Sequence, residues 1–204
     1  MALSGIITYT LRAVLFALPL AVAITALRLR LRKQRGQAID KRRELLCGLF
    51  LFYILALVQI TAIRDGAHLL DWWTLPHGWQ TVQLLPLVTT LQEAHNGPWA
   101  IIYPIVGNLV WFLPLGLLLA VLRPAWRLGK VALVSLLLSL GIEALQWLLL
   151  SGVSDIDDVL FNLAGGCSGY GLAKAWRRLG GKGRAQNDGP GLDKEAADCS
   201  AGKR

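Results

Sequence analysis

The amino-acid sequence predicts an all-α membrane protein that crosses the bilayer about five times, with its N-terminus outside and its C-terminus inside. Composition is the first reason: 54% of the 204 residues are hydrophobic and 17% are charged, whereas soluble domains carry about 25% charged residues. The second reason is that the hydrophobic residues form runs, several of them near the roughly 20 residues that a helix needs to cross a bilayer. Such hydrophobicity also excludes a mainly disordered protein.

Five hydrophobic runs are expected to form the transmembrane helices: residues 5–27, 45–63, 99–122, 131–150 and 159–176. The positive charges follow the first run rather than precede it, so we expect a retained helix and not a cleaved signal peptide. Residues 1–178 are predicted to form one transmembrane helical domain. The tail, residues 179–204, contains Gly, Lys and Asp without periodicity and is predicted to be a disordered cytoplasmic segment.

The distribution of basic residues predicts the orientation. The net charge is +8, and most Lys and Arg lie in three clusters, at Arg28–Arg43, at Arg123–Lys130 and from Lys174 onward. Clusters at alternate ends of hydrophobic runs follow the positive-inside rule and place all three on the cytoplasmic side of a plasma or inner membrane. We expect residues 28–44 to be a polar cytoplasmic loop. No basic face is interleaved with aromatic residues, which argues against nucleic acid as a partner.

Residues 64–98 are expected to form a solvated outer loop. This loop contains Asp and Glu residues and all the histidines of the chain, His68, His77 and His95. The histidine spacings fit no standard pattern of metal ligands, and the cysteines form neither a disulfide framework nor a metal-binding pattern. The sequence therefore predicts no metal site and no cofactor.

Polar side chains inside the predicted spans are the candidates for function, because ionisable groups within a bilayer are costly to bury. Glu143 is the clearest, and Gln146 lies three residues further along the same helix face. Polar residues of other spans share this depth, so we expect one polar pocket in the outer half of the membrane. Its candidate ligand-binding residues are Asn108, Glu143, Gln146, Asp155, Asp158 and Asn162.

Each of these residues also has a structural alternative. Asn108 and Asn162 can join helices by hydrogen bonds. Asp155 or Asp158 can cap a helix N-terminus. Gln146 can bond a backbone carbonyl that a proline has left free, and Glu143 can be protonated and satisfied by hydrogen bonds. The sequence alone favours a site over these separate roles because the residues share a common depth.

The acidic segment after the fourth span is expected to form the mouth of this pocket. Asp155 and Asp158 share a helix face, and their charge would attract a cationic headgroup, a peptide amine or a divalent ion. Asp157 points away from that face and is expected to matter least. Gly165 and Gly169 have the spacing of a close helix contact, which we expect to bring the fifth span against the fourth.

Four short segments resemble, in order, the motifs of a known family. They are Leu84-Leu-Pro86-Leu, Asn108-Leu-Val-Trp-Phe-Leu-Pro-Leu-Gly116, Glu143-Ala-Leu-Gln146 and Asp155-Ile-Asp-Asp-Val-Leu-Phe-Asn162-Leu-Ala-Gly165. Together they resemble the VanZ-like membrane proteins, named for a teicoplanin-resistance protein, over roughly residues 45–173. One position departs from the pattern: the family often carries Arg three residues before the first Asp of the acidic segment, where this chain has Gly152.

The resemblance implies a cell-envelope protein of the plasma membrane and supplies no reaction. We expect a lipid-linked or glycopeptide-like ligand in the polar pocket, and membrane lipids as the other partners. The alternatives are an intramembrane enzyme acting on an envelope precursor, since paired carboxylates suit acid–base work, and a small proton-coupled transporter, since a buried Glu suits a proton site.

Overall fold

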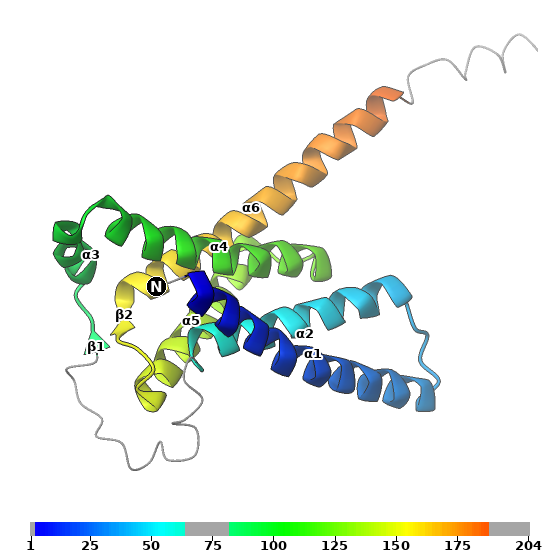
Figure 1. The fold of residues 1–204 in the computed structure, drawn as a ribbon. Helices are drawn as coiled ribbons and strands as arrows, with labels where there is room; N and C mark the ends of the chain where they lie inside the picture. The colour runs from blue at the N-terminus through cyan, green and yellow to red at the C-terminus, as the bar shows by residue number, and fades with distance from the viewer. Residues whose placement is uncertain (1–2, 64–81, 188–204) are drawn as a thin grey trace, which may run out of the picture.

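The computed structural model describes residues 3–63 and 82–187, and the chain there is mainly helical (Figure 1). The predicted outer loop lies partly outside the described residues, because residues 64–81, with His68 and His77, are not among them. The elements follow in the order α1 (Leu3–Gln34), α2 (Lys41–Thr61), β1 (Val82–Gln83), α3 (Val88–Glu93), η4 (Ala94–Asn96), α4 (Pro98–Leu122), α5 (Leu128–Leu149), β2 (Ser154–Asp155) and α6 (Ile156–Asn187).

Helices α1 and α2 form an antiparallel pair (Figure 1). The predicted loop at residues 28–44 is wrong in extent, because α1 continues to Gln34 and α2 begins at Lys41. Between residue 27 and Gly36 the sequence contains neither Gly nor Pro, and Gly36 takes a left-handed conformation (φ 64°) and ends α1. Asp40 then starts α2, since its carboxylate accepts the backbone N–H groups of Arg42 and Arg43.

Helices α4 and α6 approach each other closely through glycines. A methyl group added at Gly165 or Gly169 would run into the backbone of α4, at Leu109 and Leu113 respectively. We expected these glycines to contact the fourth predicted span, which is α5. They contact α4 instead, so this prediction is wrong. Gly166, which the prediction did not include, is the glycine that packs on α5, at Ser135. Small residues thus let α6 lie against both α4 and α5.

Replacing Gly169 by alanine is expected to destabilise the protein, because the added methyl group has no room against the Leu113 carbonyl oxygen. Overpacking of this kind costs about 1–3 kcal/mol. Gly171→Ala, on the same helix, is the matched control, since nothing lies within 4 Å of the position its methyl group would take. Thermal unfolding of the detergent-solubilised protein measures both. Equal midpoints for the two variants would contradict the close contact.

The hydrophobic core lies between α2, α4 and α5. Its most buried side chains include Leu57 of α2, Phe112 and Leu115 of α4, and Val131 and Ile142 of α5. Elsewhere the helices carry many large hydrophobic side chains on their outer surfaces. A water-soluble protein rarely exposes apolar surface on this scale, whereas lipid covers such a surface in a membrane.

Four helices in the described part of the chain are long and apolar enough to cross a membrane: residues 10–34 of α1, and α2, α4 and α5. The fifth predicted span falls within α6, whose crossing stays a prediction. Helix α6 continues past residue 178, the predicted end of the helical domain, to Asn187, and it projects beyond the other helices (Figure 1). The rest of the predicted tail, residues 188–204, lies outside the described residues.

The first two basic clusters, and the residues of the third that lie near Arg177, are at one end of the helices. Arg177 of α6 donates to the Ala120 carbonyl near the end of α4 (2.8 Å), and Arg28 of α1 and Arg43 of α2 line one cavity together with Arg123 of the α4–α5 turn. At the opposite end, β1 pairs in parallel with β2, and Ser151, just after α5, donates to the Ala62 carbonyl at the end of α2 (2.7 Å). This arrangement is the one that the predicted topology requires, although the orientation itself stays a prediction.

Candidate functional site

The polar end of the molecule is built on the reversal of the chain between α5 and α6. Leu150 takes a left-handed conformation (φ 47°) and ends α5, which turns the chain back along the helix. Ser154 then donates its hydroxyl to the carbonyl of Glu143 (2.7 Å). The Glu143 carboxylate in turn accepts the backbone N–H of Asp155 (2.9 Å). Glu143 thereby fixes the position at which α6 begins.

Asp155 starts α6 in the manner of a helix cap. Its carboxylate accepts the backbone N–H of Asp157 at 2.9 Å, one of the N–H groups that a helix start leaves without an intrahelical partner. Both Glu143 and Asp155 are buried. Asp155 therefore makes the helix-capping bond that the sequence offered as its structural alternative.

Asp157 links two segments that are far apart in the sequence. Its carboxylate accepts the backbone N–H of Leu87 (2.7 Å) and the hydroxyl of Thr90 (2.7 Å), and only 2% of the residue is exposed. The expectation that Asp157 matters least rested on its position off the Asp155–Asp158 face, and it did not include these two bonds. Its two bonds fix the start of α3 on the start of α6.

Three further candidate residues join neighbouring helices. Asn108 of α4 donates to the Asp158 carboxylate of α6. Asn162 of α6 donates to the Ser139 hydroxyl of α5 (2.9 Å). These bonds are the interhelical contacts that the sequence offered as the alternative to a ligand site.

Gln146 joins α5 to α2, since its side-chain amide donates to the carbonyl of Thr61 (3.2 Å). The amide oxygens of Gln146 and Asn162 and the hydroxyl of Ser135 are buried and have no hydrogen-bond partner among the described residues. An unsatisfied buried polar atom costs about 1–3 kcal/mol. These oxygens are therefore places where a donor from outside the described residues would bind favourably.

A cavity of about 240 Å³ lies beside Glu143. Glu143 and Asp155 line it, together with residues of β1 and apolar side chains of α5 and α6, among them Leu140, Trp147 and Val159. The structure thus brings two of the six predicted site residues to one cavity. The other four, Asn108, Gln146, Asp158 and Asn162, make the helix-joining contacts described above.

Sequence comparison agrees with the motifs. The profile of the VanZ/LLP1 family matches residues 50–177. The chain belongs to the VanZ/LLP1 family. No curated protein and no solved structure matches it. Together with the four apolar helices of membrane-spanning length, the family match makes this a membrane protein and confirms the resemblance of residues 45–173 to VanZ-like proteins.

The acidic segment of this VanZ/LLP1 chain does not form one ligand cluster. Asp155, Asp157 and Asp158 direct their carboxylates to three different partners. Among the described residues, no group of three or more His, Cys, Asp or Glu side chains is placed to hold a metal ion.

Proposed function

We propose that this VanZ/LLP1 protein is a ligand-binding protein of the cell envelope that holds a lipid-linked or glycopeptide-like molecule in the cavity beside Glu143, at the outer side of the plasma membrane. The observation that carries the proposal is the wall of that cavity. Its surface is almost entirely apolar, and the buried carboxylates of Glu143 and Asp155 belong to residues that line it. At about 240 Å³ the cavity is smaller than the usual 300–1,000 Å³ of small-molecule sites, so it takes part of such a ligand: a hydrocarbon segment against the apolar wall, with a hydrogen-bond donor directed at the carboxylates.

The charge distribution favours a cationic donor, such as a peptide amine. The acidic residues of the α5–α6 segment lie at one end of the helices, and the basic clusters lie at the other. A positive group near Glu143 and Asp155 is attracted by both carboxylates, and burial strengthens the attraction because the local dielectric is low. An anionic group at the same place is repelled.

Binding suits this geometry better than the two alternative functions. The carboxylates of Glu143, Asp155 and Asp157 each accept hydrogen bonds from the backbone. Such bonds hold each carboxylate in one place. A carboxylate fixed in this way is an acceptor already positioned for a ligand.

Filling the cavity is expected to weaken binding. Ala144 lines the cavity from α5 and is exposed, so Ala144→Trp fills the space with little strain on the core. Leu137→Trp is the matched control, on the same helix, exposed, and outside the cavity. The probe is a polyprenyl-linked glycopeptide with a free peptide amine, measured by binding to the protein in lipid nanodiscs.

We expect Ala144→Trp to weaken binding of this probe by about 10-fold or more, the loss of roughly 1.4 kcal/mol of contact, while Leu137→Trp binds as the unmodified protein does. Acetylating the amine of the probe is expected to weaken binding to the unmodified protein, because the acetylated group is neutral. Binding that is unaffected by both Ala144→Trp and acetylation would refute the proposed site.

A further inference from the structure

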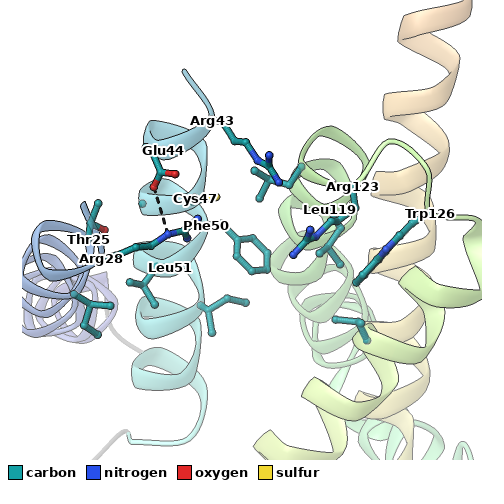
Figure 2. Close-up of a pocket in the computed structure, with 15 residues that line it drawn as sticks. Thr25, Arg28, Arg43, Glu44, Cys47, Phe50, Leu51, Leu119, Arg123 and Trp126 are labelled. Atoms are coloured by element: carbon teal, nitrogen blue, oxygen red, sulfur yellow. Dashed lines mark ion pairs between the residues drawn. The ribbon is translucent and has the colours of Figure 1, made fainter. Parts of the chain in front are cut away.

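A second cavity lies at the basic end of the molecule, far along the helices from Glu143. Its volume is about 530 Å³, and it is lined by residues of α1, α2, α4 and α5 (Figure 2). Arg43 of α2 and Arg123, at the end of α4, both extend into the space between these helices, and Phe50 points into it from α2 (Figure 2). Nothing in the proposed function uses this cavity.

The side chains that line this cavity carry more positive than negative charge. Glu44 is 4% exposed and is paired by Arg28 (3.4 Å) and by Arg32. Two arginines therefore already compensate the one carboxylate that lines the cavity. Within the described part of the chain, Arg43 and Arg123 have no carboxylate partner. The cavity thus offers two guanidinium groups to an anion.

The deeper part of the cavity is apolar. Phe50, Leu51 and Ile54 line it from α2, and Leu119 lines it from α4. A free inorganic anion would leave this surface without a partner, whereas an amphiphile would cover it with an acyl chain. A guanidinium group binds phosphate oxygens with two parallel hydrogen bonds.

We propose that this cavity binds an anionic phospholipid of the cytoplasmic leaflet, with the phosphate between Arg43 and Arg123 and an acyl chain along Phe50 and Leu119. The volume lies within the range of small-molecule sites, about 300–1,000 Å³. Basic pockets between membrane helices on the cytoplasmic side are known to select anionic headgroups. The lipid would join the α1–α2 pair to the α4–α5 pair at the end where the apolar cavity separates them.

The test measures lipid preference of the full chain in detergent by native mass spectrometry, with phosphatidylglycerol and phosphatidylcholine of identical acyl chains as probes. We expect the unmodified protein to prefer phosphatidylglycerol by about 30-fold, which corresponds to two arginines that each contribute about 1 kcal/mol. Arg43→Gln/Arg123→Gln is expected to lose most of this preference. Arg127→Gln/Lys130→Gln is the matched control, because both residues are exposed and basic, lie at the same end, and do not line the cavity.

A single variant and a competition measurement test the proposal further. Arg43→Gln alone leaves the Arg123 contact with Trp126 intact and is expected to lose part of the preference even if the double variant unfolds. Soluble glycerol phosphate is expected to compete only at far higher concentration than the lipid, since it lacks the acyl chain. Equal loss of preference in the arginine pair and in the control pair would show general surface attraction and overturn the site. Competition by glycerol phosphate at the concentration of the lipid would overturn the lipid as its occupant.

Discussion

Replacing Asp157 by leucine is expected to destabilise the protein by about 3–6 kcal/mol, since a hydrogen bond to a charged group contributes about 1.5–3 kcal/mol and the variant loses two. The Leu87 N–H and the Thr90 hydroxyl would both lose their acceptor in a place where the carboxylate is 2% exposed. The contact between the start of α3 and the start of α6 depends on those bonds. We therefore expect the segment before α4 to detach before the helices separate.

Two measurements check this expectation. The thermal midpoint of Asp157→Leu in detergent should fall well below that of the unmodified protein, and hydrogen exchange should quicken over residues 82–91. Thr90→Val, which removes one of the two bonds, is expected to cost about half as much. Unchanged exchange over residues 82–91 in Asp157→Leu would show that something else holds this segment.

The sequence predicted the helices better than their ends. Hydrophobic runs of membrane length located α2, α4 and α5 because lipid exposure demands continuous apolar residues. The extent of α1 was missed, because Arg28, Arg30 and Arg32 are polar yet compatible with a helix. Charge marks where a helix leaves the bilayer, and it does not mark where the helix stops.

In the candidate site, the sequence predicted individual residues better than the contacts between distant parts of the chain. Glu143 and Asp155 were found because acids in or beside apolar runs stand out. The role of Asp157 was not predicted, because its partners Leu87 and Thr90 lie far away in the sequence. The Leu-Leu-Pro-Leu segment before α4 was a signal, but nothing in one sequence connects it to the acidic segment. Helical periodicity ordered the acids by face and could not show that each face meets a different element.

Substitutions at Glu143 are expected to have the second large effect. Two variants distinguish its structural role from its role in ligand binding. The carboxylate accepts the Asp155 N–H at 2.9 Å in a buried place. Glu143→Leu leaves that N–H without an acceptor and is expected to cost about 1–3 kcal/mol. Glu143→Gln keeps a side-chain oxygen that can accept the same bond, so its thermal midpoint should stay near that of the unmodified protein.

The charge of Glu143 is what glutamine removes. If the cavity binds the amine of the glycopeptide probe, Glu143→Gln is expected to fold normally and yet bind that probe about 10-fold more weakly, because one of two carboxylates facing the amine is neutral. It should bind the acetylated probe as the unmodified protein does. A Glu143→Gln protein that is as destabilised as Glu143→Leu, with no difference between the two probes, would leave Glu143 with the structural role of holding the start of α6 and would remove the charge argument for a ligand.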